Sequence, residues 1–219
     1  MSKLDRRELI LKAARDFFAR TGLEGARTAL LARAAGVSER LLYKHFPSKE
    51  ALHEAALKSL ADEMMGDAKR IFSLEPSTST LVILTHYLVH AFLSHSPERD
   101  AYLRASLRSM AGDGHFIRFT RQQALSPYHA KLEKCVEVAI SAGDIPKYAA
   151  PARIASYLIE ALGAGVGPWL LPNPPIVEFG MDRQHLIEEI VRFALRGLGL
   201  SEPVIERHYN PKALALLGG

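Results

Sequence analysis

Apolar residues recur at intervals of three and four along most of this chain, the spacing that places them on one face of an α-helix. The first such stripe is formed by Ile10, Ala13, Ala14, Phe17, Phe18 and Thr21. It predicts a helix from about Leu4 to Arg20, which Gly22 ends. No proline occurs before Pro47, so nothing interrupts helix formation in this segment.

The same spacing predicts further helices, separated by glycine, proline and serine. Their expected ranges are 28–35 (with Thr28 as its N-cap), 39–45, 49–72, 78–94, 97–111, 115–142, 149–166 and 182–198. The helix over 115–142 has a possible break at Ser126-Pro127. The segment 167–180 contains four prolines and is expected to be a loop. The tail is expected to hold one short turn of helix, from Pro211 to Leu217.

The amino-acid composition agrees with a helical protein. Ala and Leu together number 61, whereas the β-branched Val and Ile number 21. Apolar residues make up 48% of the chain, enough to bury a core and to exclude a wholly disordered protein. We therefore expect an all-α fold of about nine helices.

Basic residues are concentrated at the start of the chain. Residues 1–50 hold eleven Lys or Arg and six Asp or Glu, whereas the other 169 residues carry a net charge of −1. A basic head on a nearly neutral body suggests a module that binds a polyanion, although a solvated charged face would give the same count. We expect three parts: a basic, polyanion-binding domain at residues 1–50, a larger helical domain at 51–200 and a C-terminal tail at 201–219.

Several classes of protein are disfavoured. Charges at 5–8 and at Lys12 leave no apolar stretch for a secretion signal, and the apolar centre Leu81–Leu93 is too short to span a bilayer. The single cysteine, Cys135, excludes an intramolecular disulfide and a multi-cysteine zinc site. These features predict a soluble, cytoplasmic protein that does not bind a membrane.

Residues 32–46, ARAAGVSERLLYKHF, have the layout of a helix-turn-helix. Gly36 permits the positive φ that such a turn commonly needs, and Ser38 can cap the second helix. Leu42 and Phe46 are four apart and can face the core. The side chains expected to face outward, toward a groove, are Arg40, Leu41, Lys44 and His45.

The second of these helices offers groups that suit DNA. Ser38 can hold a phosphate oxygen, and Tyr43 can donate its hydroxyl to one, with core packing as the alternative for Tyr43. Arg40 could bind guanine bidentately and Glu39 could accept from cytosine N4. Equally, Arg40 and Glu39 could pair with each other or with solvent. Leu41 could contact a thymine methyl group.

Residues 10–52 resemble the DNA-binding domain of the TetR (tetracycline-repressor-like) family of bacterial transcription regulators. Outside the first helix, the matching residues are Leu31-Ala32, Ala34-Ala35-Gly36-Val37-Ser38, Leu42-Tyr43, His45-Phe46, Ser48-Lys49-Glu50 and Leu52. In the first helix they are Ile10, Ala13, Ala14, Phe17, Phe18 and Gly22. The rest of the chain agrees with the family only in length and in its expected number of helices.

The resemblance implies an all-α homodimer that binds double-stranded DNA at a palindromic operator. The helix 39–45 would read the major groove, and Tyr43, His45 and Lys49 match positions that commonly contact phosphates. Thr28 lies near the threonines that open the second helix in many members. Many members have Gly or Pro where this chain has Arg40. The implied function is a ligand-responsive regulator, expected to be a repressor that a small molecule releases from DNA.

A family member would bind its effector in the second domain, and such pockets are apolar with a few polar anchors. We expect a small hydrophobic or amphipathic effector near aromatic and polar residues of the apolar helices, each of which could equally be core. The candidates are His86, Tyr87, His90, Phe92, Met110, Phe116, Phe119 and Trp169.

We expect neither a metal nor a cofactor. His86 and His90 share a helical face and could bind a metal, but no nearby cysteine or carboxylate completes a ligand set. Cys135 could be a redox sensor, although a buried helical cysteine is the simpler interpretation.

Small residues at alternate positions of the run 161–167 would let two helices approach closely. The alternatives are a close packing within one chain and fraying of the helix end. Together with the family resemblance, this run points to a homodimer formed by the helices 149–166 and 182–198. The expected contacts are Tyr157, Ala161, Gly165, Ile187, Val191 and Ala194.

The sequence also bears on two other classes of function. The chain has no Gly-rich phosphate loop, nucleophile elbow or pair of carboxylates at a telling spacing, so we expect no catalytic residues and no enzyme. A DNA-binding protein without a ligand is the other alternative. It would bind DNA with little sequence preference, with a steep salt dependence and without an effector response.

Overall fold

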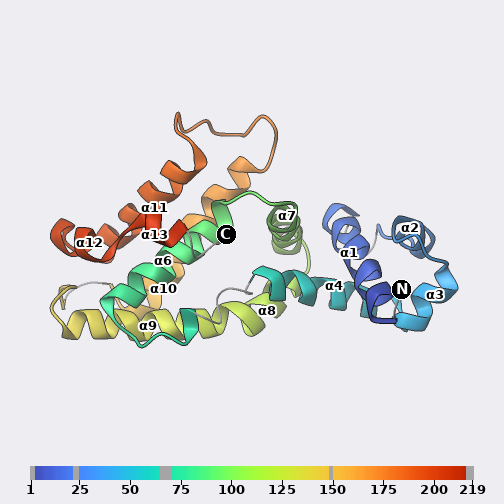
Figure 1. Ribbon diagram of the computed structural model, residues 1–219, viewed down its shortest axis with the longest axis horizontal. Helices are drawn as coiled ribbons and strands as arrows, with labels where there is room; N and C mark the ends of the chain where they lie inside the picture. Colours follow the sequence, from blue (N-terminus) through green and yellow to red (C-terminus); the bar gives the residue numbers. More distant parts are fainter. Residues whose placement is uncertain (1–2, 22–24, 65–70, 148–149, 216–219) are drawn as a thin grey trace. The chain divides into compact units, whose positions relative to one another are not determined.

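The protein is described here by a computed structural model covering residues 3–21, 25–64, 71–147 and 150–215. Helices joined by turns and loops make up these ranges, and they contain no strand (Figure 1). The expected all-α fold is therefore confirmed. None of the helices in these ranges has both the length and the apolar character needed to cross a membrane.

The helices lie close to the expected ranges. They are α1 (Lys3–Thr21), α2 (Thr28–Ala34), α3 (Glu39–His45), α4 (Lys49–Met64), α6 (Thr78–Leu93), α7 (Pro97–Ala111), α8 (His115–Thr120), α9 (Ser126–Ser141), α10 (Ala152–Val166), α11 (Arg183–Gly197), α12 (Glu202–His208) and α13 (Pro211–Ala215). Serine side chains accept hydrogen bonds at the N-termini of α3, α6 and α7, as their sequences favour.

Three boundaries differ from those expected. The predicted helix 49–72 is seen as α4 up to Met64, and residues 65–70 lie outside the described ranges. The predicted helix 115–142 is divided into α8 and α9 by a π-helical turn, Arg121–Leu125, which ends directly before Ser126-Pro127. A 3₁₀ turn, Gly167–Leu170, continues α10 into the segment expected to be a loop.

The tail is more helical than its sequence suggested. The expected short helix is present as α13, and α12, which was not predicted, precedes it. Pro203 lies in the first turn of α12, where a backbone N–H has no partner within the helix, so its absence removes no hydrogen bond. A proline at this position is typical of a helix start, and the prediction did not use it. Ile205 and Leu214 are buried, so both helices belong to a packed structure.

Contacts group the chain into two compact units. The head unit comprises Met1–Met64 and Ser96–Ala124, and the body unit comprises Met65–His95 and Leu125–Gly219. The grouping differs from the expected division at residues 50 and 200, because α7 and α8 pack with the N-terminal helices and α12 packs with α6 and α11. The functional boundaries at 50 and 200 remain predictions.

The head unit has a core of apolar side chains from α1 to α4. The predicted stripe on α1 is largely confirmed, since Ile10, Ala14 and Phe18 are buried and Ala13 and Phe17 pack against the core. Thr21 is the exception: it is exposed, and its hydroxyl donates to the carbonyl oxygen of Phe17. The other buried members of this core are Leu11, Ala26, Leu31, Ala32, Ala35, Leu42, Phe46, Leu52 and Ala56.

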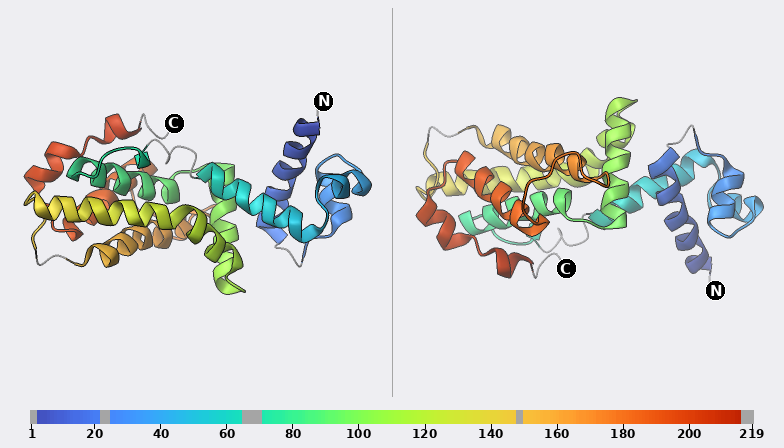
Figure 2. Two further views of the ribbon diagram at one scale, coloured as in Figure 1. Left: turned by 90° about the horizontal axis from the view of Figure 1, so that it is seen from below. Right: turned by 90° about the horizontal axis from the view of Figure 1, so that it is seen from above.

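The body unit is built around α6, which packs against α9, α10 and α11 (Figures 1 and 2). Most of its residues are buried, as expected for a helix that is apolar on several sides. The Tyr128 hydroxyl on α9 donates to the carbonyl oxygen of Leu84 over 2.6 Å. This bond fixes α9 against α6 inside the core.

A buried polar cluster joins α9 to α10. It was not predicted, because no spacing within one helix indicates it. His129 Nε2 lies 2.8 Å from Glu160 Oε2, and His129 Nδ1 lies 3.1 Å from Ser156 Oγ. The Ser156 hydroxyl also lies within 2.9 Å of the carbonyl oxygen of Arg153. Ser156 is fully buried, so this serine–histidine–carboxylate arrangement cannot reach a substrate. Its hydrogen bonds instead satisfy polar groups in the core.

The C-terminal helices are attached to α6 by two histidine contacts. His86 Nδ1 lies 3.2 Å from the hydroxyl of Tyr209, which follows α12, and both side chains are buried. His208 Nδ1 lies 2.8 Å from Ser79 Oγ. Arg192 covers the Tyr209 ring at 5.5 Å. Residues 201–215 are therefore an integral part of the body unit.

Burial makes the stability of the body unit depend on pH. Removal of His86 from water lowers the pKa of its imidazole to about 4, because the charged form loses its hydration. The ring faces Tyr209 and stacks on His90 at 5.9 Å. In the unfolded chain His86 takes up a proton near pH 6.5, whereas in the folded chain it does so only near pH 4. The stability that comes from burying the uncharged His86 ring is therefore complete above pH 6.5 and is lost as the pH falls toward 4.

We expect the free energy of unfolding to fall by about 2 kcal/mol between pH 7 and pH 5 through His86 alone. Denaturant unfolding at the two pH values measures this change. The His86→Gln variant should lose most of that dependence, whereas His95→Gln, at an exposed position, should keep it. An unchanged pH dependence in His86→Gln would contradict this role of His86.

Candidate nucleic-acid interface

The turn between α2 and α3 has the geometry that its sequence predicts. Gly36 adopts a φ of +64°, in the left-handed region that glycine occupies without strain. The N–H of Gly36 donates to the carbonyl of Arg33, and the N–H of Val37 donates to the carbonyl of Ala32. These two bonds form a Schellman motif, which ends α2 and turns the chain into α3.

Side-chain hydrogen bonds then fix the start of α3. Ser38 Oγ accepts from the N–H of Leu41 over 3.2 Å, which confirms the predicted cap. The Thr28 hydroxyl donates to Glu39 Oε2 over 2.9 Å and ties the first residue of α2 to the first residue of α3. Thr28 is not the N-cap of α2, as its sequence had suggested; that position is Arg27, which makes no side-chain cap.

The two faces of α3 are separated as predicted. Leu42 is completely buried and Phe46 is 3% exposed, whereas Tyr43 is 45% exposed and therefore is not part of the core. The other exposed side chains of α3 are Glu39, Arg40 and Lys44, and the partly exposed ones are Leu41 and His45. No ion pair between Arg40 and Glu39 occurs in the described structure. The exposed face of α3 is therefore basic, and the guanidinium of Arg40 on this face is available for binding.

A groove of about 510 Å³ lies beside this face. It is lined by Ala26, Arg27, Thr28, Ala29, Tyr43, Pro47, Ser48, Lys49 and Glu50. Lys49 is the first residue of the 16-residue helix α4, whose N-terminal N–H groups carry a partial positive charge. Together with Arg27 and the Tyr43 hydroxyl, this end of α4 can hold a phosphate oxygen. Arg27 was not among the predicted contacts, because only the packing of the helices brings it to this groove.

The start of α4 is itself capped. Ser48 Oγ accepts from the N–H of Ala51 over 3.0 Å. Hydrogen bonds from its own backbone N–H and from Ser48 hold the pKa of Glu50 below its usual value. The Glu50 carboxylate thus stabilises the N-terminus of α4 and lies at the edge of the groove.

The eight effector candidates lie in both units. Met110, Phe116 and Phe119 belong to the head unit, and the other five belong to the body unit. Met110 is 59% exposed, whereas Phe92 is buried against α10, where a Cβ on Gly163 would lie 2.9 Å from its ring. His86 is engaged by Tyr209, and Tyr87 and His90 are partly buried. Their assignment to an effector remains a prediction.

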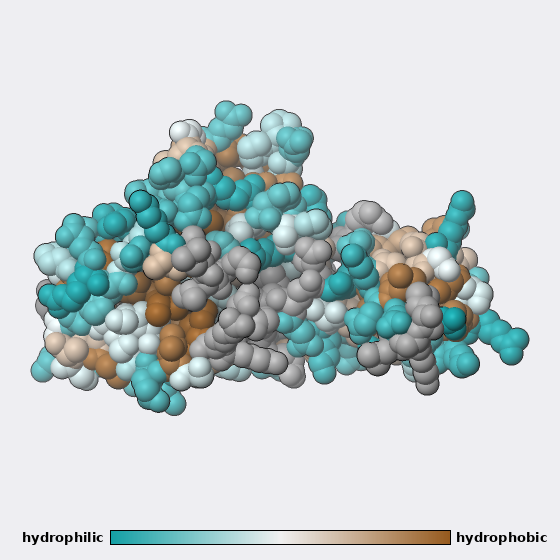
Figure 3. Space-filling view, in the orientation of Figure 1, coloured by the Kyte–Doolittle hydropathy of each residue, from teal (hydrophilic) through white to brown (hydrophobic). Residues whose placement is uncertain are grey.

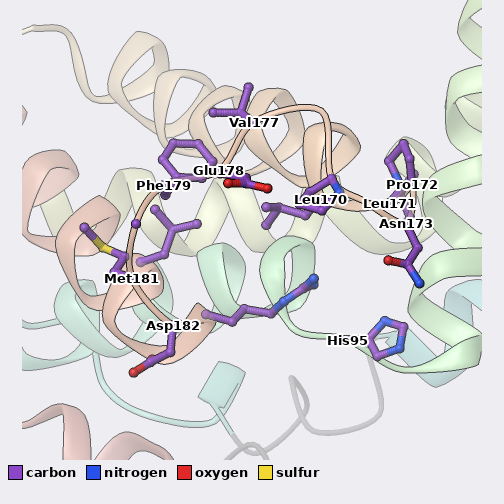
Figure 4. Close-up of a pocket in the computed structure, with 14 residues that line it drawn as sticks. His95, Leu170, Leu171, Pro172, Asn173, Val177, Glu178, Phe179, Met181 and Asp182 are labelled. Atoms are coloured by element: carbon purple, nitrogen blue, oxygen red, sulfur yellow. The ribbon is translucent and has the colours of Figure 1, made fainter.

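The body unit contains a pocket of about 760 Å³ that none of these candidates lines. Figure 4 shows its walls: Val177 and Phe179 lie across the pocket from His95, and Pro172 and Asn173 close one end. The segment after the 3₁₀ turn forms most of the lining. Trp169 stacks on Phe179 with ring centroids 6.4 Å apart, so this candidate supports the wall. The other lining residues are Leu170, Leu171, Pro175, Glu178, Gly180, Met181, Asp182, Arg183 and Leu186.

The expected dimer contacts divide into two groups. On α10, Tyr157, Ala161 and Gly165 are exposed. On α11, Ile187, Val191 and Ala194 are at most 4% exposed. These three face the core of their own chain, so the predicted α11 contacts are wrong. The sequence stripe identified the buried face of α11 and overlooked its exposed Phe193.

The described residues contain no group of three or more His, Cys, Asp or Glu that could hold a metal ion. Cys135 is completely buried, and burial raises the pKa of its thiol.

Comparison with known proteins identifies the N-terminal part. Residues 10–56 match the family model of bacterial regulatory proteins of the tetR family. The nucleoid occlusion factor SlmA of Vibrio cholerae is 36% identical over 96 residues, 43% of this chain and 49% of that protein. The chain thus matches about half the length of this curated relative.

Two solved structures are similar over most of the chain. One is AibR in complex with isovaleryl coenzyme A and operator DNA, with a TM-score of 0.66, 17% identity and coverage of 86% of this chain and 97% of that one. The other is FadR of Bacillus subtilis in complex with stearoyl-CoA, with a TM-score of 0.64, 17% identity and coverage of 87% and 98%. At this identity the similarity shows a shared fold.

The positive φ of Gly36 leads to a test of the turn. A Cβ at Gly36 would meet no atom within 4 Å, so Gly36→Ala introduces backbone strain without a clash. We expect a loss of roughly 1–2 kcal/mol in the free energy of unfolding. Gly197→Ala is the matched control, since Gly197 is helical and its Cβ would also meet open space. It should leave stability unchanged or raise it by at most about 1 kcal/mol. Equal effects in denaturant unfolding would contradict the strain argument.

Proposed function

From the match of residues 10–56 to the family model of bacterial regulatory proteins of the tetR family, we propose that this chain represses transcription as a homodimer. The dimer binds a palindromic operator, and a small hydrophobic or amphipathic effector releases it. The observation that carries this proposal is the exposed basic face of α3 beside the groove at the start of α4. Since its target is bacterial DNA, the protein acts in the cytoplasm.

The roles on DNA follow from position and chemistry. Arg40 lies in the first turn of α3 and is exposed, so it is proposed to read a guanine in the major groove. Glu39 is held by Thr28 and positions the two helices, although its second carboxylate oxygen can still accept from cytosine. Tyr43 and Lys49 border the groove and are proposed to bind phosphates. The remaining proposed contacts are Ser38, Leu41, Lys44 and His45.

Base reading and phosphate binding predict different variant behaviour. DNA fragments selected from a random pool give the operator, and fluorescence anisotropy gives affinities for it and for single-base changes. Arg40→Ala should reduce discrimination at one base pair by about 1–3 kcal/mol. Lys49→Ala should weaken binding to all sequences by a similar factor and lower the salt dependence.

Lys58→Ala removes the same charge from the exposed side of α4, away from the groove, and is the control. If Arg40→Ala weakened binding equally for every sequence, the base-reading role of Arg40 would be wrong.

The proposed dimer uses the exposed apolar face of α10. Ile154, Tyr157 and Leu158 are 52%, 37% and 56% exposed, and the small Ala161 and Gly165 continue the same face. Phe193 on α11, which contacts α10, is 63% exposed. The face shown in Figure 3 mixes hydrophilic and hydrophobic residues. A row of large apolar side chains with small ones beyond it suits a close helix–helix interface.

A single charge should separate the proposed dimer. Leu158→Glu would place an unpaired carboxylate in the interface, so sedimentation at micromolar concentration should give monomers. Val138→Glu, on the 40% exposed Val138 of α9, should remain dimeric. A wild-type chain that sediments as a monomer would rule out the dimer, and dimeric Leu158→Glu would rule out this interface.

The effector is proposed to bind in the pocket of the body unit. Its walls combine apolar side chains such as Leu171 and Phe179 with the polar Asn173 and Glu178. This mixture suits an amphipathic molecule. AibR and FadR, which share the fold, were solved with isovaleryl coenzyme A and stearoyl-CoA. These complexes support a search among molecules with an acyl or similar apolar part.

A DNA-binding function without an effector is the second candidate. The similarity to a nucleoid occlusion factor favours it, and that similarity covers about half of the relative. The two functions are distinguished by adding acyl-CoA and other amphipathic compounds to the preformed complex with the selected operator. Release supports the effector-controlled repressor. Sequence-blind, salt-sensitive binding with no release supports the second candidate.

A further inference from the structure

A pocket of about 600 Å³ in the head unit is not used by the proposed function. It is bordered by the end of α1, by α4, by α7 and by the start of α8. Its lining residues are Phe18, Thr21, Glu50, His53, Glu54, Leu57, Ala105, Arg108, Ser109, Gly112, Asp113, His115 and Phe116. All of them belong to one compact unit. The volume lies within the range that small-molecule sites occupy.

The inner part of this pocket is apolar. Phe18, Leu57 and Phe116 are at most 4% exposed, and Ala105 is 9% exposed. The imidazole of His53 stands edge-on to the Phe18 ring, with centroids 4.7 Å apart. Burial lowers the pKa of His53, so at neutral pH its ring is uncharged and offers one donor and one acceptor. An aromatic or branched apolar group can be accommodated against these side chains.

The rim carries opposite charges on different helices. Glu54 projects from α4 and Arg108 from α7, and both line the same pocket. In the part of the chain that the structure describes, neither side chain has a hydrogen bond or an ion pair, with the other or with another residue. A carboxylate and a guanidinium are therefore both available to a molecule between the two helices.

Three other rim side chains already take part in hydrogen bonds within the chain. Asp113 accepts from the N–H of His115 over 2.8 Å, Ser109 Oγ accepts from the N–H of Ile117, and Glu50 stabilises the start of α4. Among the charged rim side chains, Glu54 and Arg108 are the two with no side-chain partner in the described residues. A ligand with a single charge would leave one of them without a partner, whereas a zwitterion can pair with both.

We propose that this pocket binds a free amino acid with an aromatic or branched apolar side chain. Its ammonium group pairs with Glu54, its carboxylate pairs with Arg108, and its side chain packs against Phe18 and Phe116. The bound molecule joins α4, which begins at the phosphate-binding groove, to α7. Such a ligand can change DNA affinity if the two helices are spaced differently on and off DNA, and DNA then changes ligand affinity by the same factor.

Calorimetric titration of the full chain with three probes tests the charge requirement. The probes are L-phenylalanine, 2-phenylethylamine and 3-phenylpropionate, which share the ring and differ in charge. Phenylalanine should bind at least about tenfold more tightly than either analogue, because each analogue lacks one charge-assisted bond. Absence of phenylalanine binding at millimolar concentration, or equal affinity for all three probes, would overturn the proposal.

Variants then locate the site. Glu54→Gln and Arg108→Gln should each weaken phenylalanine binding about tenfold or more. Asp62→Asn on α4 and Arg104→Gln on α7 are the matched controls, since neither side chain lines the pocket, and they should bind as the wild type does. Thr21→Trp places an indole at the mouth from an exposed position and should abolish binding without loss of helical circular dichroism. If phenylalanine bound all the variants equally, it would occupy another site and the proposal would be wrong.

Discussion

The left-handed conformation at Gly36 is the constraint on which the DNA-facing surface depends. It lets the Schellman bonds end α2 and direct the chain into α3 within a few residues. The orientation of α3 then buries Leu42 and Phe46 and leaves Arg40 and Tyr43 on the outside. Since a helix that reads DNA must present side chains at defined positions, a small change in this turn would displace every contact together.

Hydrogen bonds outside the turn stabilise the same arrangement. Thr28 and Glu39 join the beginnings of α2 and α3, and Ser38 and Ser48 cap α3 and α4. All four residues are close to the proposed DNA surface, so the groups that define the local fold also orient the basic side chains. The apolar core of α1 to α4 supports this surface from beneath. The hydrogen bonds that cap α3 and α4 therefore also set the positions of the side chains proposed to contact DNA.

The head could be predicted in detail because its signals are local. Helical periodicity, one glycine and one capping serine are sufficient to give α1 to α3 and the buried face of α3. The body could be predicted only as helices. Which side of α11 is buried depends on its neighbours, so its apolar stripe could not distinguish a core from an interface, and Ile187 and Val191 were assigned to the wrong surface.

The pockets were beyond prediction for the same reason. Each is formed by residues distant in sequence: Glu54 meets the same cavity as Arg108, and His95 lies opposite Phe179. The polar cluster of His129, Ser156 and Glu160 likewise arises only when α9 and α10 pack together. No spacing within one helix indicates such a partnership. Of the predicted effector residues, Phe116 lines the pocket of the head unit, and Trp169 packs on Phe179 in the wall of the pocket in the body unit.

The central claim is that two copies of this chain read one palindromic DNA sequence. Its most direct test is sedimentation of the complex with DNA selected from a random pool, alongside a scrambled duplex of the same composition. The account predicts an even number of chains per selected duplex and much weaker binding to the scrambled one. A single chain bound per duplex, or equal affinity for both duplexes, would contradict it.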